Sequence, residues 1–288
     1  MTRWEGTATA FVHTSNKKTM KTIQTFASVL LLITAGCGTT GQRHSTENHA
    51  LAKKVVTLPA QPRPVELDIQ KTAVIVVDMQ NDFVTKGGLF DRLGIGVAGM
   101  QNIVARIGKT LEVARKEGLP IVYVKMGYRP DLLDIGPADS PMGAENRRAQ
   151  VGQKMRAPDG REGRLLVRDT WNTDIVDELK PHAGDIVVYK TRFSGFYKTE
   201  LEAILNRRGI RTLIMMGGTT SVCVESTLRD AMFRDFMPVL LSDCTTEPIG
   251  QELPRNNHEA TLLVIQEAPF GAVATSADFV KALEALKR

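Results

Sequence analysis

Cysteine and aromatic residues are scarce in this 288-residue chain, and each scarcity excludes a class of protein. Three cysteines cannot build the disulfide framework of a small secreted domain. Aromatic residues make up 6% of the chain, and the body has no basic stripe with aromatic residues between the basic ones, so we expect no nucleic-acid partner. Hydrophobic residues at 42% and charged residues at 24% are typical of folded globular proteins, which excludes fibrous and wholly disordered classes.

The apolar run near the N-terminus is too short to cross a membrane. The segment FASVLLLITA occupies residues 26–35, whereas a membrane-spanning helix needs roughly 20 residues. Basic residues precede this run, and small residues and then Cys37 follow it. This order predicts a lipoprotein-type signal peptide over residues 1–37, with Met20 as a natural start and Cys37 as the lipidated residue. We therefore expect a lipid-anchored periplasmic or surface protein of the bacterial cell envelope, or a cytoplasmic one if the leader is not translated.

Residues 38–66 are rich in Gly, Thr, Gln and Pro and include the segment PAQPRP at 59–64. This composition predicts a flexible tether with extended, polyproline-like character. One domain over residues 67–288 then remains, and it is long enough to bury a core of its own.

Short apolar segments alternate with helical patterns through this domain. The sequence predicts strands at 73–80, 121–126, 185–190, 212–218 and 238–244. It predicts helices at 97–117, 199–208, 222–235 and 256–266. Fully apolar strands alternating with helices indicate a mainly parallel sheet that is covered on both faces. We therefore expect a doubly wound, three-layer α/β/α sandwich whose site lies beyond the carboxyl ends of the strands.

Residues 127–170 interrupt this alternation. They contain four prolines and many charged residues, and they follow the end of the second predicted strand. A long irregular insert in a compact domain is usually functional or disordered. We expect this segment to be a loop that covers the substrate.

Three reactive side chains stand at or after predicted strand ends. Asp78 ends the first strand, Lys190 ends the third, and Cys223 follows the fourth by five residues. Taken singly, each has an ordinary structural role, since buried cysteines pack, aspartates cap and lysines are solvated. Because the carboxyl ends of parallel strands share one edge, the three groups are expected to meet there. Together they fit a nucleophile, a base and an orienting cation.

The expected chemistry starts at the sulfur of Cys223. A helix N-terminus and the Lys190 ammonium are both expected to lower the thiol pKa. Asp78 would take the thiol proton and return it to a leaving amine. Backbone N–H groups around Thr219 and Cys223 could form an oxyanion hole.

Three segments in this order resemble the signature of a known family. They are VVDMQNDF at 76–83, KTRFSGFYKTEL at 190–201 and GGTTSVCVESTLRD at 217–230, and they resemble the isochorismatase-like cysteine hydrolases. The resemblance covers roughly residues 67–280. It implies a six-stranded sheet, a catalytic triad of Asp78, Lys190 and Cys223, and a cis peptide between Gly218 and Thr219. It also implies a homo-oligomer, either a dimer or a tetramer.

Within that family, the chain is most similar to ureidoacrylate amidohydrolase, biuret hydrolase and N-carbamoyl amidase members. Their similarity implies hydrolysis of a C–N amide bond in a small ureido or carbamoyl compound through a covalent thioester. Met126 departs from the ureidoacrylate enzymes, which carry Asn at that position. Two alternatives stay open: vinyl-ether hydrolysis of the isochorismate type, and a non-catalytic, lipid-anchored envelope protein.

The remaining candidates are weaker. The residues expected at the substrate are Phe83, Tyr128, Asp134, Trp171, Asn172, Ser194 and Phe196. Cys244 is expected to be a small packed residue without a disulfide to Cys223. His182 and His258 show no ligand spacing and are expected to be surface groups, so we predict neither a metal nor another cofactor.

Overall fold

The structure is a computed structural model, and it describes residues 54–287. The predicted signal peptide, the predicted lipidation site at Cys37 and the first part of the predicted tether lie outside the described residues. Within residues 54–287, none of the helices combines the length and the apolar character that a bilayer span requires.

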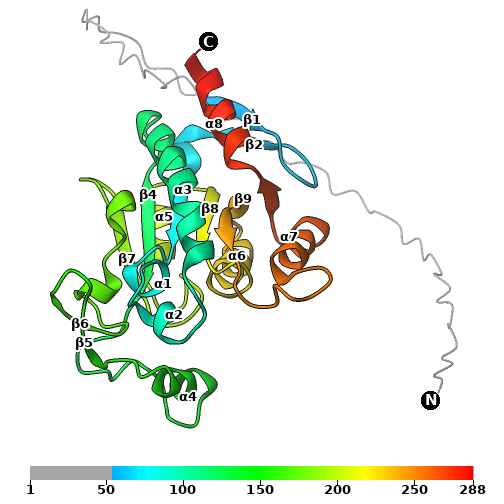
Figure 1. Cartoon of the computed structure of the whole chain (residues 1–288). Coiled ribbons are helices and arrows are strands. Elements are labelled where there is room, and N and C mark those ends of the chain that lie inside the picture. The colour runs from blue at the N-terminus through cyan, green and yellow to red at the C-terminus, as the bar shows by residue number, and fades with distance from the viewer. Residues whose placement is uncertain (1–53, 288) are drawn as a thin grey trace, which may run out of the picture. The chain divides into compact units, whose positions relative to one another are not determined.

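A six-stranded parallel sheet forms the centre of the domain (Figure 1). Its strand order is β10-β9-β8-β3-β4-β7, and every neighbouring pair is parallel. The strands are β3 (Thr72–Val77), β4 (Ile121–Met126), β7 (Ile186–Lys190), β8 (Thr212–Gly218), β9 (Met237–Thr246) and β10 (Ala272–Ala274). The order reverses direction at β3, where doubly wound folds place their sites.

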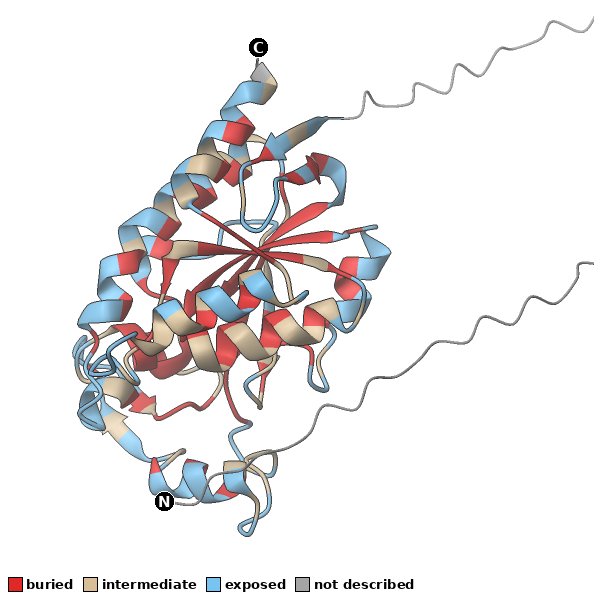
Figure 2. Cartoon of the chain, turned by 90° about the vertical axis from the view of Figure 1, so that its right-hand side faces the viewer, coloured by how far each residue is buried: buried red, intermediate tan, exposed pale blue. Residues whose placement is uncertain are grey.

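Helices cover both faces of this sheet, which confirms the predicted three-layer sandwich. The helices are α3 (Ala98–Lys116), α5 (Leu201–Arg207), α6 (Glu225–Met232), α7 (Asn257–Glu267) and α8 (Ser276–Glu284). Helices α3 and α8 pack together on one face, and α5 and α6 lie behind the strands in the view of Figure 1. Figure 2 shows the buried residues concentrated on the strands and the exposed residues on the outer sides of the helices.

The sequence patterns explain why these elements form. Every residue of β3 is buried, as expected for a central strand covered on both faces. Along α3, the buried residues recur every three or four positions, at Met100, Ile103, Ile107, Leu111 and Ala114. This spacing gives one apolar stripe along the helix that packs on the sheet.

The predicted tether is wrong for residues 55–66, which belong to the folded domain. They contain the antiparallel hairpin β1 (Val55–Leu58) and β2 (Val65–Asp68), with the PAQPRP segment as its connection. Leu58 is fully buried in the core. Gln61 pairs with Val273 of β10 through two backbone hydrogen bonds of 2.8 and 2.9 Å. Tertiary pairing therefore orders a segment whose composition is typical of linkers.

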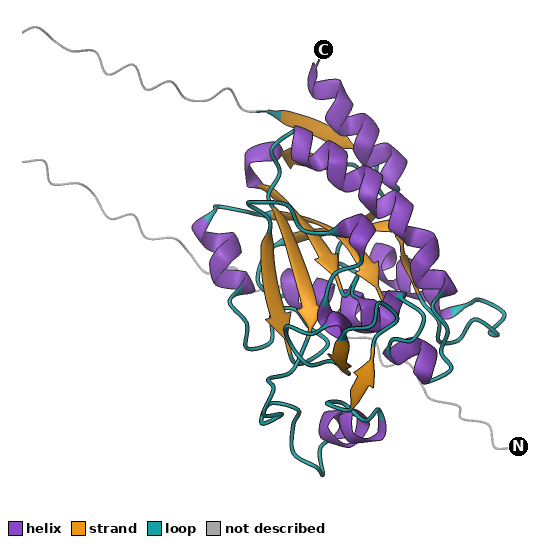
Figure 3. Ribbon diagram, turned by 60° about the vertical axis from the view of Figure 1, so that its left-hand side comes forward, coloured by secondary structure: helices purple, strands orange, loops and turns teal. Residues whose placement is uncertain are grey.

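The insert at 127–170 is also more regular than predicted. It contains the helix α4 (Pro141–Arg148) and the antiparallel strands β5 (Lys154–Arg156) and β6 (Glu162–Arg164). The Ser140 side chain caps α4 by accepting a hydrogen bond from the Gly143 amide at 3.1 Å. In Figure 3, the strand arrows of the central sheet point toward the end of the domain where this insert lies.

One buried carboxylate attaches the insert to the domain. Asp82 lies in the short helix α1 (Asn81–Val84), directly after β3, and accepts hydrogen bonds from the amides of Leu89 and Leu166 at 3.1 and 2.7 Å. Leu89 begins the short helix α2 (Leu89–Arg92). The Asn172 amide donates a third hydrogen bond to Asp82, at 2.6 Å. Burial raises the pKa of Asp82 to about 7, against the lowering effect of these hydrogen bonds.

Candidate active site

Asp78 lies immediately after β3 and turns its side chain into the site. Its φ of 53° is in the left-handed region, which aspartate adopts more readily than most residues. The Met126 amide at the end of β4 donates a 2.8 Å hydrogen bond to Asp78 Oδ1. The residue is 2% exposed, so its carboxylate faces the site in a medium of low polarity.

Lys190 is the last residue of β7 and reaches across β4 toward Asp78. The register pairs Lys190 with Met126, so β4 separates it from β3. Its long side chain spans that strand, and Nζ lies 2.8 Å from Asp78 Oδ2 and 3.2 Å from Cys223 Sγ. Lys190 is fully buried. Burial lowers the pKa of Lys190. The Asp78 carboxylate and Cys223 together raise this pKa by more than burial lowers it, so the net shift is upward.

Cys223 lies in a tight turn between β8 and α6. The turn begins at the cis peptide between Gly218 and Thr219, the position that the family resemblance implies. Residues Thr220–Val224 then form one π-helical turn, and α6 begins only after it. Cys223 therefore lies before the α-helix, whereas the sequence predicted that the helix would begin at residue 222 and include it. Gly217 has φ 118°, and a side chain there would collide with the backbone oxygen of Val77 in β3.

The expected low thiol pKa is wrong for the resting site. Burial raises the pKa of Cys223 well above its ordinary range, and the charge of Asp78 and its hydrogen bond with the thiol raise it further. Lys190 lowers it, but by less than these two effects together. The upward shift favours the protonated thiol, next to the Asp78–Lys190 ion pair.

A second buried carboxylate holds the cysteine turn in place. Glu247, which is 1% exposed, accepts hydrogen bonds from the Ser221 amide at 2.8 Å and the Ser221 hydroxyl at 2.7 Å. The other oxygen of Glu247 accepts a hydrogen bond from the Ile249 amide at 3.0 Å. His258 Nδ1 lies 2.9 Å from the Thr220 hydroxyl. His258 is half-buried in this network, so the prediction of a simple surface group is wrong for it.

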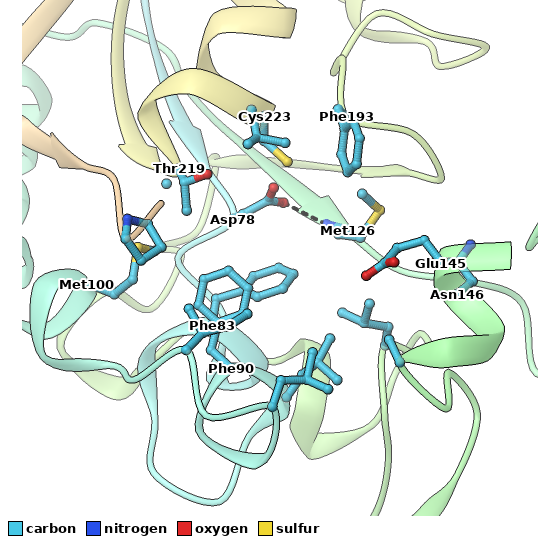
Figure 4. Close-up of a pocket in the computed structure, with 18 of the residues that line it drawn as sticks. Asp78, Phe83, Phe90, Met100, Met126, Glu145, Asn146, Phe193, Thr219 and Cys223 are labelled. Carbon is cyan, nitrogen blue, oxygen red and sulfur yellow. Dashed lines mark hydrogen bonds between the residues drawn. The ribbon is translucent and has the colours of Figure 1, made fainter. Parts of the chain in front are cut away.

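A cavity of about 210 Å³ opens beside the three side chains. Asp78, Thr219 and Cys223 form one side of it, and Phe83 and Phe90 form another (Figure 4). The rings of these two phenylalanines contact each other, with centroids 4.8 Å apart. Other lining residues are Leu89, Leu93, Ile95, Met100, Met126, Tyr128, Met142, Glu145, Asn146, Ala149, Leu166, Phe193, Gly218, Val222, Pro248 and Ile249. The arrangement places a thiol and a carboxylate at the wall of a pocket suited to a small molecule, with the buried Lys190 ammonium behind them.

Comparison with known proteins assigns this domain to a family. The family model described as the isochorismatase domain matches residues 72–278. The chain belongs to the isochorismatase family. It is a hydrolase of that family, and the resemblance of the three signature segments is confirmed.

Two curated family members illustrate the similarity in sequence. Ureidoacrylate amidohydrolase RutB of Rhizobium rhizogenes is 42% identical over 224 residues, covering 78% of this chain and 88% of that protein. Ureidoacrylate amidohydrolase RutB of Caulobacter segnis is 41% identical over 229 residues, covering 80% of this chain and 92% of that protein.

Solved structures of family members share the fold. A cysteine hydrolase from Pseudomonas syringae pv. phaseolicola superposes with a TM-score of 0.64 at 26% identity, covering 82% of this chain and all of that one. The N-carbamoylsarcosine amidase from Thermoplasma acidophilum has a TM-score of 0.53 at 29% identity, covering 72% of this chain and 96% of that one.

Two of the residues predicted to lie at the substrate do line the pocket of this isochorismatase-family domain, namely Phe83 and Tyr128. The Tyr128 hydroxyl donates to Asn146 Oδ1 at 3.0 Å, which ties the pocket wall to the insert. Trp171 and Asn172 belong to a short 3₁₀ helix outside the pocket. The Asn172 side chain donates a hydrogen bond to Asp82, and Trp171 is its neighbour in that helix. Neither lines the pocket.

Three more predicted substrate residues have structural contacts instead. Ser194 hydrogen-bonds Asp230 at 2.5 Å, and Phe196 is buried with its ring centroid 5.8 Å from that of Phe236. Asp134 accepts hydrogen bonds from the Arg129 amide, so its side chain stabilises a turn of the insert itself. Sequence patterns do not distinguish Ser194 and Phe196 from a pocket residue, because Phe193, which does line the pocket, lies one and three positions away from them.

The prediction missed several residues that line the pocket. Phe193, next to the predicted Ser194, and Glu145 and Asn146 of α4 all border it. The position of the insert after β4 was the one available signal for the two α4 residues. The loop after β9 also contributes Pro248 and Ile249, which no sequence motif marked.

Other titratable groups of the domain have structural roles. Cys244 is fully buried and free, as predicted, and no disulfide joins it to Cys223. His182 is exposed, as predicted. Within residues 54–287, no cluster of three or more His, Cys, Asp or Glu side chains has the arrangement of a metal site.

Proposed function

We propose that this hydrolase cleaves a C–N amide bond of a small ureido or carbamoyl compound through a thioester on Cys223. The reaction class is hydrolysis of a C–N amide bond. The observation that carries the finer proposal is the meeting of three side chains from distant segments, with Lys190 Nζ 2.8 Å from Asp78 Oδ2 and 3.2 Å from Cys223 Sγ. These distances suit proton transfer and charge stabilisation during attack by sulfur.

The first half-reaction starts from the protonated thiol. A carbonyl carbon bound in the pocket approaches Cys223 Sγ, and the thiol proton passes to Asp78, because Lys190 Nζ lies between the two groups, 2.8 Å from Asp78 Oδ2 and 3.2 Å from Cys223 Sγ. The new S–C bond pushes the carbonyl electron pair onto oxygen. Backbone amides at Thr219 and Cys223, both at the pocket wall, are suited to hold this oxyanion. The C–N bond then breaks, and the leaving nitrogen takes the proton from Asp78.

The second half-reaction restores the enzyme. Asp78 takes a proton from water, whose oxygen attacks the thioester carbon. The S–C bond breaks, and Lys190 stabilises the thiolate until Asp78 returns the proton. Overall, one amide and one water molecule give one carboxylic or carbamic acid and one molecule of ammonia or amine.

The relatives support this choice of bond. The curated relatives are named ureidoacrylate amidohydrolase, and one structural neighbour is an N-carbamoylsarcosine amidase. Both names describe carbamoyl-type amides. The regions that match these three proteins at 42%, 41% and 29% identity cover 78%, 80% and 72% of this chain.

The test measures ammonia release from a panel of alkylureas, carbamoyl amino acids, biuret and nicotinamide. We expect turnover of at least one carbamoyl compound, with an acyl adduct on Cys223 detected by mass spectrometry of rapidly quenched enzyme. Cys223→Ala should lose at least about 10³-fold in kcat and show no adduct.

Cys244→Ala is the matched control, because Cys244 is also free and buried but lies away from the pocket. It should keep both the activity and the adduct. Retained turnover in Cys223→Ala would refute the thioester proposal. Release of pyruvate from isochorismate, without ammonia release from any amide, would favour the vinyl-ether alternative.

A further inference from the structure

The pocket also restricts the chemical class of the substrate. Building on the proposed amide hydrolysis, we propose that the group attached to the scissile amide is apolar and uncharged. We further propose that Glu145 makes the pocket selective against anionic substrates. This inference concerns the part of the substrate that does not react, so it can fail while the proposed chemistry stands.

The walls of the pocket away from Cys223 are almost wholly apolar. Phe83 and Phe90 come from the segment after β3, Met142 from the insert, and Phe193 from the segment after β7. Ile249, from the loop after β9, is 59% exposed, so the apolar surface continues to the opening of the pocket. Exposed apolar side chains gathered around a cavity indicate a surface that an apolar ligand covers.

Among the described residues that line the pocket there is no Lys, Arg or His. The charged side chains that line it are Asp78 and Glu145, and both are acidic. The ammonium of Lys190 lies behind them, fully buried and paired with Asp78 at 2.8 Å. A carboxylate on the bound substrate would therefore be removed from water without a cation to receive it, which disfavours its binding.

Glu145 strengthens this selection. It lies on α4 with its carboxylate directed toward the pocket (Figure 4), and its side chain is 47% exposed. Arg148 donates two hydrogen bonds to it, at 2.9 and 2.6 Å, which hold the carboxylate in one position. Arg148 itself does not line the pocket. Arg148 offsets part of this charge, but the carboxylate is the member of the pair that lines the pocket and faces an incoming anion.

The substrate proposed for this chain differs in charge from the substrate in the name of its curated relatives. Ureidoacrylate, in the name of the curated relatives, contains a carboxylate. The pocket described above contains no cationic partner for that group, although the three reactive side chains are in place. We therefore expect the same bond to be cleaved in a different, uncharged ureide or amide.

Two ureides of matched size test this directly. 3-Ureidopropionate and isopentylurea share the ureido group and a two-carbon link, and they differ in a terminal carboxylate against a terminal isopropyl group. Ammonia release is measured for both, together with their ability to protect Cys223 from alkylation by iodoacetamide. We expect isopentylurea to be favoured by at least about 100-fold in kcat/KM and to protect at lower concentration.

Charge variants at position 145 test whether the Glu145 carboxylate causes the preference for the uncharged ureide. Glu145→Gln should raise kcat/KM for 3-ureidopropionate severalfold relative to that for isopentylurea, and Glu145→Arg should raise this ratio further. Glu112→Arg is the matched control, because Glu112 is an exposed acid of α3 that does not line the pocket. It makes the same change in net charge and should leave the ratio of the two substrates unchanged.

The outcomes separate the two proposals. A preference for 3-ureidopropionate in turnover or protection would overturn the inference and leave the amide hydrolysis intact. If neither compound releases ammonia and Cys223 forms no adduct with any amide, the proposed function fails. The protection assay still decides the inference in that case, since equal or better protection by 3-ureidopropionate refutes it.

Discussion

Replacing Lys190 by Met should destabilise the protein by about 3–5 kcal/mol, because it leaves the Asp78 carboxylate buried without its cation. Both side chains are almost fully inaccessible, and their charged atoms are 2.8 Å apart. Methionine fills nearly the same volume, so loss of packing contributes little to the expected change. The measurement is urea denaturation at neutral pH and fixed protein concentration, with the free energy of unfolding extrapolated to zero urea.

The double variant Asp78→Asn with Lys190→Met isolates the electrostatic part. Asn can still accept the hydrogen bond of the Met126 amide, and the unpaired charge is gone. We expect the double variant to be more stable than Lys190→Met alone by at least about 2 kcal/mol, a coupling typical of a buried pair. Additive effects of the two substitutions would refute the argument that an uncompensated charge causes the loss.

The same two substitutions should move the reactivity of Cys223 in opposite directions. Lys190 lowers the thiol pKa and Asp78 raises it, while the effect of burial remains in both variants. The pH profile of Cys223 alkylation should therefore shift to higher pH in Lys190→Met and to lower pH in Asp78→Asn. Shifts of the same sign, or unchanged profiles, would contradict the assigned electrostatic roles.

Three further predictions concern groups that support the site. Because the pKa of Asp82 is raised to about 7, the folded state keeps a proton that the unfolded state loses between about pH 4 and 7, and stability falls as the pH rises through this window. Asp82→Asn should remove about 2–3 kcal/mol of that fall between pH 5 and 8, measured by urea denaturation. Glu247→Gln should lower kcat/KM about tenfold in steady-state assays, because an amide N–H would face the donors of Ser221 and Ile249. Gly217→Ala should cost more than about 3 kcal/mol of unfolding free energy, because φ is 118° and the Cβ would strike the backbone of β3.

The sequence alone predicted the fold class and the three reactive side chains. Four of the five predicted strands, at 121–126, 185–190, 212–218 and 238–244, lie within one to two residues of β4, β7, β8 and β9. Fully buried parallel strands and amphipathic helices have distinct local patterns, so these elements can be recognised from short stretches of chain. Asp78, Lys190 and Cys223 could be placed together because the topology sends parallel strand ends to one edge.

The sequence missed elements whose order comes from distant contacts. The hairpin β1–β2 has a linker-like composition but pairs with β10, more than 200 residues away. The insert is fixed by Asp82, whose partners Leu166 and Asn172 are 84 and 90 residues further along the chain. No local pattern records such pairs.

Tertiary structure also decided the electrostatics and the shape of the site. A thiol near a cation and a helix suggests a lowered pKa, but the burial of Cys223 and its contact with Asp78 have the larger effect. The apolar pocket is assembled from segments after β3, β4, β7, β8 and β9. Desolvation and cavity lining depend on what surrounds a side chain in space, so the sequence determined which reactive groups are present, and the folded structure determined their protonation and which substrate can reach them.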